Sequence, residues 1–260
     1  MKKIVFIDVD GTMYHAHEDS ISESIKEKLK EASNYVDLFV STGRCNLALT
    51  CLKEARNYFK GFVLSNGAYV LYNNQIVSEK VVEKEDMIKL IQVAKELNSN
   101  IGLITDKVIY VDKLTDIVDY ALTPRDHNSI IVVEDYNFDL NLKYHMAWSF
   151  DELDKINEME KKLPNNFTFF KWGKIGSDII LNDTTKAKGI VELLKHLDGE
   201  FKTYAIGDSG NDIPMFKLVD VPICMGNGTD AAKEHATYIT KTLDEGGLEF
   251  ALDNIIKGVW

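Results

Sequence analysis

The sequence predicts an α/β protein in which an α+β module, residues 83–183, interrupts a doubly wound, Rossmann-like parallel-sheet core made of residues 1–82 and 184–260. In both outer parts, short apolar runs alternate with amphipathic helical segments, which is the pattern of a parallel sheet with helical crossovers. Between these parts the alternation stops and hairpin signals appear, as in antiparallel structure. Because the two outer parts share one pattern, we expect them to form a single domain.

The first predicted strand, Ile4–Ile7, leads directly into a pair of carboxylates. Four consecutive apolar residues are typical of a buried strand, and Asp8 and Asp10 follow where Gly11 lets the chain turn. Two carboxylates this close repel each other unless a cation lies between them, and Mg²⁺ takes such oxygen ligands together with phosphate oxygens. An ordinary Asp-Gly turn at the end of a core strand is the alternative interpretation.

The rest of the first part continues the alternation of helices and strands. A capping box at Ser20 predicts a helix, and residues 36–40 predict a strand that runs into Thr42–Arg44. A helix through about Tyr58 and a strand over 62–65 complete a βαβαβ unit.

The interrupting module has the signals of a mostly antiparallel sheet with two long helices. A hairpin that turns at 73–74 precedes it, and a capping box at Ser149 predicts the start of its second long helix. We expect Trp148, Phe170 and Trp172 to be core residues of this module. Its other predicted elements are a helix over 85–98, a hairpin over 101–112, a short helix, strands over 130–134 and 143–148, and a final hairpin.

Parallel-sheet structure resumes with a helix over 187–197 and a strand over 203–206. This strand ends in the loop Gly207–Asp212, whose two acidic residues, asparagine and two glycines are more than an ordinary turn requires. A strand over 221–225, a helix, a short strand over 238–240 and a closing helix complete the predicted core.

Polar side chains follow three strands of the predicted parallel sheet. They are Asp8 with Asp10, then Thr42, and then Asp208 in the last of these loops. Carboxyl ends of parallel strands lie along one edge, where open α/β sheets bind ligands, so we expect these groups to converge. Such a set suits phosphoryl transfer: one carboxylate attacks phosphorus, the other transfers protons, and Mg²⁺ with fixed donors offsets the negative charge. The residues alone leave open which of the first two acids attacks.

Four short motifs occur in order along the chain. They are Asp-Val-Asp-Gly-Thr at 8–12, Ser-Thr-Gly-Arg at 41–44, Lys188-Gly189, and Gly-Asp-Ser-Gly-Asn-Asp at 207–212. In these motifs the chain resembles the haloacid dehalogenase superfamily over essentially its whole length. The inserted module, with Asn-Gly-Ala at 66–68 and Met-Gly-Asn at 225–227, is similar to the Cof-like phosphatases that carry a large α/β (type IIB) cap. The first and last motifs are specific together, whereas the threonine and lysine motifs mean little alone.

The resemblance implies a role for each residue of these motifs. Asp8 is implied as the nucleophile, Asp10 as the general acid and base, and Thr42 with Lys188 as the phosphate-binding pair. We choose Lys188 over its neighbour Lys186 because the family's motif places a glycine directly after the lysine. The implied metal ligands are Asp8, Asp10 through its backbone carbonyl, Asp208 and Asp212, and the further substrate-binding candidates are Thr12, Gly43, Arg44 and Asn211. The inserted module would be a cap that selects the substrate.

Two other kinds of residue near the motifs have less specific signals. Arg44 is equally suited to an anion contact and to a structural ion pair. We expect His15 and His17 to lie in an exposed loop rather than to bind a metal.

The composition is that of an ordinary globular protein, with 45% hydrophobic and 27% charged residues in 260. A net charge of −11 argues against nucleic acid or an anionic membrane as the main partner. The cysteines, Cys45, Cys51 and Cys224, are odd in number and scattered, so we expect reduced structural thiols. No apolar run is long enough to span a membrane and no targeting segment is visible, which favours a cytoplasmic protein.

We therefore predict a Mg²⁺-dependent phosphatase that hydrolyses a small phosphorylated metabolite, a sugar phosphate or a phosphorylated cofactor, through an aspartyl-phosphate intermediate. Mn²⁺ is an alternative metal because it favours the same oxygen ligands. A phosphotransferase or phosphomutase would use the same intermediate, and a phospho-accepting regulatory protein is the alternative outside enzymes. The sequence leaves the oligomeric state open.

Overall fold

The computed structural model describes residues 1–15, 18–122 and 130–260. The chain forms two compact units. The first contains Met1–Arg44, Leu49–Ser78 and Thr185–Trp260, and the second contains Cys45–Ala48 and Glu79–Thr184. Within the described ranges, no helix has the length and apolar character that a membrane span requires.

The first unit is built on an eight-stranded sheet with β1 (Lys2–Ile7) near its centre. The other strands are β2 (Asp37–Ser41), β3 (Phe59–Leu64), β4 (Tyr69–Tyr72), β5 (Gln75–Glu79), β12 (Phe201–Gly207), β13 (Val221–Cys224) and β14 (Tyr238–Ile239). Their order is β14-β13-β12-β1-β2-β3-β4-β5. The pairings from β14 to β3 are parallel, and β3 pairs antiparallel with β4. This sheet confirms the predicted parallel-sheet core.

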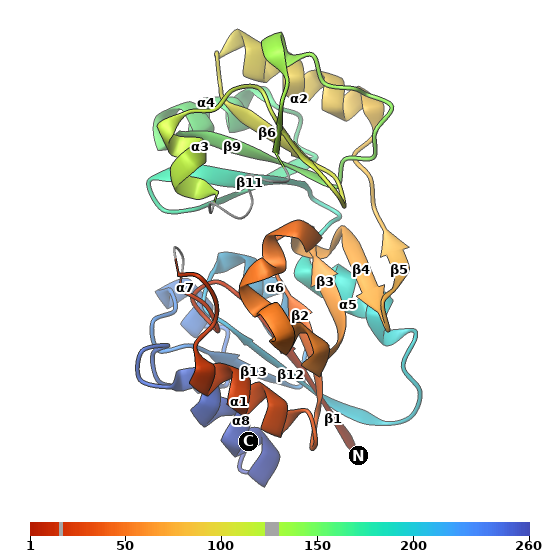
Figure 1. Ribbon diagram of the computed structural model, residues 1–260, viewed down its shortest axis with the longest axis vertical. Coiled ribbons are helices and arrows are strands. Elements are labelled where there is room, and N and C mark those ends of the chain that lie inside the picture. The colour runs from red at the N-terminus through yellow and green to blue at the C-terminus, as the bar shows by residue number, and fades with distance from the viewer. Residues whose placement is uncertain (16–17, 123–129) are drawn as a thin grey trace. The chain divides into compact units, whose positions relative to one another are not determined.

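Helices cover both faces of this sheet, because successive side chains of a strand point to opposite sides. Val5 and Ile7 pack into one buried cluster with residues of α1 (Glu23–Ala32) and α8 (Gly247–Lys257), which lie side by side (Figure 1). Ile4 and Phe6 pack into a second cluster with residues of α5 (Lys186–Leu194) and α6 (Ile213–Phe216). The remaining short elements are α7 (Asp230–Lys233) and the 3₁₀ turns η2 (Ser65–Gly67) and η5 (Gly210–Asp212).

Two local predictions in the first part of the chain are wrong. Ser22 rather than Ser20 is the N-cap of α1, because its hydroxyl accepts a backbone N–H of the first helical turn. The predicted helix through Tyr58 is instead a 3₁₀ segment, η1 (Asn46–Tyr58), which is broken at Lys53 with a φ of 46°. A positive φ is disfavoured inside a regular helix, because the Cβ then crowds the backbone.

The second unit contains a six-stranded, mostly antiparallel sheet. Its strands are β6 (Ile101–Ile104), β7 (Ile109–Val111), β8 (Ile130–Val132), β9 (Met146–Glu152), β10 (Phe167–Lys171) and β11 (Ile175–Leu181). Their order is β10-β11-β9-β6-β7-β8, and only the β7–β8 pair among them is parallel in the described part of the chain.

The two faces of this second sheet carry different helices. On one face α2 (Lys84–Glu96) and α4 (Leu153–Lys162) pack against the sheet, and on the other α3 (Asp116–Ala121) packs beside Trp148 and Phe150. A 3₁₀ turn, η4, covers Glu134–Tyr136. The predicted capping box at Ser149 is wrong, because this residue lies inside β9 and α4 begins after Glu152.

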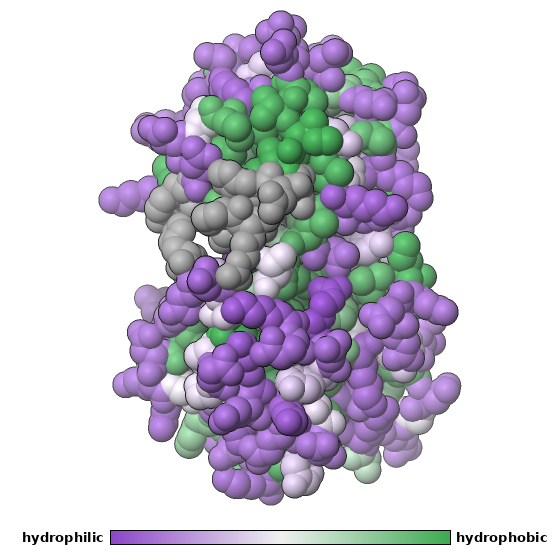
Figure 2. All heavy atoms as spheres, in the orientation of Figure 1, coloured by the Kyte–Doolittle hydropathy of each residue, from purple (hydrophilic) through white to green (hydrophobic). Residues whose placement is uncertain are grey.

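The tryptophans of the second unit differ in exposure. Trp148 is 5% exposed and is a core residue as predicted. Trp172 is 37% exposed, so the prediction that it belongs to the core is wrong. On the face drawn in Figure 2, polar residues cover most of the first unit, and hydrophobic residues gather on the second.

Candidate active site

The ends of neighbouring strands bring the predicted acidic residues to one edge of the first unit's sheet. β1 pairs in register with both β2 and β12, so Asp8, Thr42 and Asp208 follow the last paired residues at nearly the same level. The backbone N–H of Asp8 continues this pairing with a hydrogen bond of 2.9 Å to β12. Carboxylate oxygens of Asp8, Asp208 and Asp212 lie within 4.8 Å of one another.

A buried lysine joins two of these acids, and it is Lys186 rather than Lys188. Its Nζ lies 2.7 Å from Oδ1 of Asp8 and 2.6 Å from Oδ1 of Asp212. The exposed fraction of Lys186 is 1%, whereas Lys188 is exposed. The prediction that Lys188 is the lysine of the site is therefore corrected.

The geometry of α5 explains why Lys186 is selected. The buried residues of this helix are Lys186, Gly189, Ile190 and Leu193, a spacing of three and four residues that defines one helical face. Lys188 lies about 200° around the helix from Lys186 and so faces away. Gly189 is required for the packing of α5 on the sheet, because a Cβ on it would lie 2.5 Å from Cγ1 of Val63 on β3. A periodicity argument on this helix finds the right lysine.

The loop after β12 is folded around Asp212. Its Oδ2 accepts the backbone N–H groups of Asp208 and Ser209, at 2.9 and 3.0 Å. The hydroxyl of Ser209 and the carboxylate of Asp212 form a capping box at the start of η5. Gly207 leaves room for this carboxylate, since a Cβ there would lie 2.4 Å from its carbon. One carboxylate oxygen of Asp212 thus holds the loop, and the other binds Lys186.

The loop after β1 packs against Asp208. Gly11 has a φ of 70°, and a Cβ on it would lie 2.5 Å from Oδ2 of Asp208, so only glycine fits. The buried hydroxyl of Thr12 donates to Oδ1 of Asp208 across 3.4 Å. This contact positions Asp208, and the predicted contact of Thr12 with substrate stays a prediction. Asn227 fastens the same loop by donating to the carbonyl of Gly11 at 2.8 Å.

Asp10 is held by Arg44. Nε and Nη2 of the guanidinium donate to the two carboxylate oxygens, each at 2.7 Å, which is a bidentate pair. The guanidinium also lies over the ring of Tyr14, 4.9 Å from its centroid. The side chain of Asp10 is 46% exposed, so it remains accessible to a ligand. Of the two predicted alternatives for Arg44, the ion pair is present in the structure.

Thr42 and Asn211 are both bonded to Asn66, in the turn after β3, whose backbone N–H donates to the carbonyl of Thr42 at 3.1 Å. The hydroxyl of Thr42 accepts the backbone N–H of Arg44 at 3.1 Å, which leaves its own O–H to donate. Gly43 lies between these two residues, directly after β2. Nδ2 of Asn211 donates to Oδ1 of Asn66 at 3.1 Å, and this side-chain bond joins the loop after β12 to the turn after β3. The predicted substrate contacts of Gly43, Arg44 and Asn211 stay predictions.

The charges of the site do not balance. Burial, followed by the charge of Asp212, raises the pKa of Asp8 well above its usual range and that of Asp208 to about 7. Burial alone would lower the pKa of Lys186, but the charges of Asp212 and Asp8 outweigh it and raise this pKa. One ammonium group thus faces three carboxylates. This excess of carboxylate oxygens fits a hard divalent cation such as Mg²⁺.

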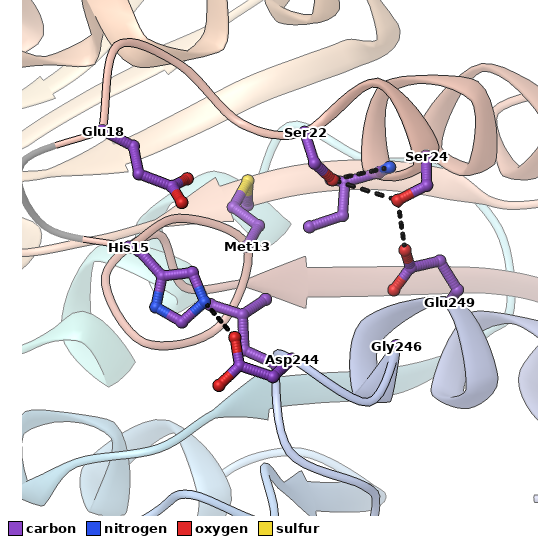
Figure 3. Close-up of a pocket in the computed structure, with 10 residues that line it drawn as sticks. Met13, His15, Glu18, Ser22, Ser24, Asp244, Gly246 and Glu249 are labelled. Carbon is purple, nitrogen blue, oxygen red and sulfur yellow. Dashed lines mark hydrogen bonds and ion pairs between the residues drawn. The ribbon is translucent and has the colours of Figure 1, made fainter.

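The pocket drawn in Figure 3 lies in the first unit, away from these acids, and has a volume of about 390 Å³. His15 lies in it and pairs with Asp244, Nε2 to Oδ1 at 2.9 Å, while Ser24 donates to Glu249 at 3.0 Å. His15 therefore takes no part in the acidic cluster, and His17 lies outside the described residues.

Comparisons with known proteins agree on one family. A family model described as haloacid dehalogenase-like hydrolase matches residues 5–252. The putative phosphatase YkrA of Bacillus subtilis (strain 168) is 25% identical, over 97% of each chain. The 5-amino-6-(5-phospho-D-ribitylamino)uracil phosphatase YwtE of the same organism is 23% identical, over 98% of this chain and 99% of the relative. The solved structure of the subclass IIB sugar phosphatase BT4131 is similar in fold, with a TM-score of 0.87 and 24% identity over 98% of this chain and 99% of that one.

Proposed function

The chain belongs to the haloacid dehalogenase-like hydrolases and is a phosphatase, and from this premise we propose that it is a Mg²⁺-dependent enzyme that hydrolyses small phosphorylated metabolites through an aspartyl phosphate on Asp8. The observation that carries the proposal is the buried group of Asp8, Asp208 and Asp212 with Lys186 hydrogen-bonded to two of them. A carboxylate that attacks a negatively charged phosphoryl group needs positive charge beside it; the ammonium of Lys186 supplies one such charge, and a divalent cation held by the carboxylates would supply the rest.

Asp8 and Asp208 are the residues that would hold Mg²⁺. Both oxygens of Asp212 already have protein partners, so its main task is to hold Lys186 and the loop, and its role as a direct ligand stays a prediction. When bound, Mg²⁺ neutralises charge on the phosphoryl oxygens and on the carboxylates that approach them. The ammonium of Lys186 and the hydroxyl of Thr42 bind the remaining phosphoryl oxygens.

In the first step an oxygen of Asp8 attacks phosphorus. The bond between phosphorus and the substrate oxygen breaks, and Asp10 donates a proton to that leaving oxygen. Arg44 holds the ionised carboxylate of Asp10 by both oxygens, which fixes the position of the group; to act as the acid, Asp10 must first take up a proton from solvent and give up one of these two bonds.

In the second step water replaces the substrate oxygen. Asp10 takes a proton from water, the water oxygen attacks phosphorus, and the bond from phosphorus to Asp8 breaks. Inorganic phosphate leaves and the carboxylate of Asp8 is restored. A second alcohol in place of water would make the same site a phosphotransferase.

The relatives suggest the class of substrate. YwtE is named for a phosphorylated ribitylamino-uracil and BT4131 for sugar phosphates. Both are small phosphate monoesters of polyhydroxylated compounds, and we propose such a compound as the partner of this chain, with neither nucleic acid nor membrane involved. A cytoplasmic location stays a prediction.

Phosphate release from a panel of phosphorylated metabolites tests the proposal. Wild-type protein and Asp8→Asn are compared with Mg²⁺, with Mn²⁺ and with a chelator, and Asp244→Asn is the matched control because its side chain is 83% exposed. We expect metal-dependent release by wild type and Asp244→Asn, and none by Asp8→Asn. Substrate loss without phosphate release would instead indicate a phosphotransferase. Equal activity of Asp8→Asn would refute the assignment of the nucleophile.

A further inference from the structure

Three consecutive residues in the turn η2, which follows β3, have a left-handed backbone. The φ angles of Ser65, Asn66 and Gly67 are 49°, 53° and 99°. Glycine adopts such angles freely, whereas other residues do so at a cost in energy. Conformations of this kind persist only where the surrounding structure imposes them. Ser65 and Asn66 are 1% and 0% exposed, so the reason for the shape of the turn must lie in its buried contacts.

The backbone of the turn holds the loop after β2. The N–H of Ser65 donates to the carbonyl of Arg44 at 2.9 Å, and the N–H of Asn66 donates to the carbonyl of Thr42 at 3.1 Å. These two bonds fix both ends of this short loop. The N–H of Thr42 itself donates to the carbonyl of Val63 in β3 at 2.9 Å. The turn thus helps to fix the residue whose hydroxyl is proposed to bind phosphate.

The side chain of Asn66 reaches the loop after β12. Its Oδ1 accepts a hydrogen bond from Nδ2 of Asn211 at 3.1 Å. Oδ1 of Asn211 in turn accepts the hydroxyl of Ser209 at 2.8 Å, which fixes the orientation of the amide. Asn211 directly precedes Asp212, whose carboxylate lies 2.6 Å from Nζ of Lys186. Asn66 is therefore bonded to the residue next to the one that holds the lysine.

The glycine of the turn packs against the start of α5. A Cβ on Gly67 would lie 2.1 Å from the carbonyl oxygen of Thr185, the residue before Lys186. A Cβ on Gly189, one turn further along the helix, would lie 2.8 Å from Cα of Gly67. At such distances the turn cannot shift without moving the helix. The turn is thus in contact with the loop after β2, the loop after β12 and the start of α5.

We propose that Asn66 is a positioning residue, which sets the spacing between the hydroxyl of Thr42 and the ammonium of Lys186 and so determines the affinity for phosphate. The inference rests on the proposed function. Two donors that bind one phosphoryl group need a fixed separation, because a misplaced donor loses its hydrogen bond. The backbone of Asn66 is bonded to Thr42, and its side chain is bonded to the loop that holds Lys186. Asn66 acts through these groups and does not itself bind substrate.

Phosphate affinity of full-length variants tests this inference. Asn66→Gly keeps the shape of the turn, because glycine adopts a positive φ freely, but removes the bond to Asn211. Asn74→Gly is the matched control, since Asn74 has a φ of 62° and is exposed in the turn between β4 and β5. We measure the Kd of inorganic phosphate by calorimetry in Mg²⁺, and kcat and KM with the two best substrates of the metabolite panel.

We expect Asn66→Gly to raise the Kd of phosphate about tenfold, which is the effect of about one lost hydrogen bond. KM should rise by similar factors for both substrates, because they share the phosphoryl group. A role in stability alone would lower the folded fraction and hence the apparent kcat, but it would leave Kd and KM of the folded molecules unchanged. Asn74→Gly should change none of these values.

A second variant and a double mutant examine how the effect arises. Asn66→Ser also removes the amide, and Ser65 shows that serine adopts this backbone in the protein. It should behave like Asn66→Gly, and it decides alone if Asn66→Gly fails to fold. Because Asn66 acts through Asn211, the double mutant of Asn66→Gly with Asn211→Ala should bind phosphate no more weakly than Asn211→Ala.

The following results would overturn the inference. Unchanged phosphate affinity in the Asn66 variants, with or without a loss of kcat, would mean at most a structural role. A KM that rises for only one substrate would indicate a contact with the alcohol part of that substrate. Losses that add in the double mutant would exclude the route through Asn211.

Failure of the proposed function gives a different pattern, in which wild type releases no phosphate from any substrate. Calorimetry with inorganic phosphate still decides in that case, because it needs no turnover. A weaker affinity of Asn66→Gly than of wild type would support the inference. Equal Kd values, or no binding by wild type, would overturn it.

Discussion

Replacement of Lys186 by methionine is the sharpest test of the charge arrangement in the site. The change removes an ammonium that lies 2.7 and 2.6 Å from two buried carboxylates, while methionine keeps most of the side-chain volume. Breaking a buried ion pair by removing one partner costs about 3–5 kcal/mol. For a protein of this size, each 1 kcal/mol corresponds to about 2–4 °C in the melting temperature, so we expect Tm to fall by roughly 6–20 °C.

The matched control is Lys188→Met, two residues further along the same helix. Lys188 is exposed, and surface substitutions usually change stability by less than about 0.5 kcal/mol. Thermal unfolding in chelator measures the stability of both variants, and phosphate release with Mg²⁺ measures their activity. We expect Lys186→Met to lose both stability and activity, and Lys188→Met to keep both.

The pH dependence separates lost charge from lost packing. Without the ammonium, Asp8 and Asp212 must be protonated or repel each other, so the deficit of Lys186→Met should be larger at pH 8 than at pH 5. A deficit that does not change with pH would indicate packing alone. If Lys188→Met were the inactive variant and Lys186→Met kept wild-type activity, the reasoning from the α5 geometry would be refuted.

Three further predictions follow from the same structure. The pKa values of Asp8 and Asp208 are higher in the folded protein than in the unfolded chain, so the folded state binds more protons. In chelator, Tm should therefore fall as pH rises from about 4 to 7. Mg²⁺ should raise Tm more at pH 7.5 than at pH 5, because the carboxylates are then ionised. Gly11→Ala should destabilise the protein by more than the roughly 1 kcal/mol expected for Gly199→Ala, which has a similar positive φ but open space around it, and equal losses in denaturant titrations would contradict the contact with Asp208. Burial raises the pKa of Asp112 to about 6. Protonated Asp112 therefore contributes about 3 kcal/mol of stability below about pH 4, and this contribution is lost as pH rises to 6. Asp112→Asn should flatten that part of the stability profile measured by urea unfolding.

The sequence predicted the parts of the site that depend on strand ends. Asp8, Thr42 and Asp208 each follow a parallel strand, and topology alone brings such positions to one edge. The choice of Lys188 was wrong because it relied on the lysine being next to Gly189 in the sequence. The residues that share the buried face of a helix are instead three or four positions apart. The spacing of Gly189, Ile190 and Leu193 points to the right lysine without any structure.

Other features were beyond sequence reasoning because they depend on contacts between distant loops. The bond from Asn227 to the carbonyl of Gly11 and the bond between Asn211 and Asn66 join segments that no local pattern relates. The break at Lys53 is similar, since no glycine marks the positive φ there. Tertiary contacts rather than propensity decide such positions.

During synthesis, β1 is made long before β12, one of the two strands with which it pairs. Lys2 pairs with Phe201, so the central strand leaves the ribosome about 200 residues before β12. At about 5–20 residues per second, β1 spends roughly 10–40 s with only β2 available to pair with it. An apolar strand with an open edge is a site for aggregation, so this interval is when the nascent chain most needs a chaperone. Asp208 arrives with β12, and the candidate active site is therefore assembled among the last parts of the molecule.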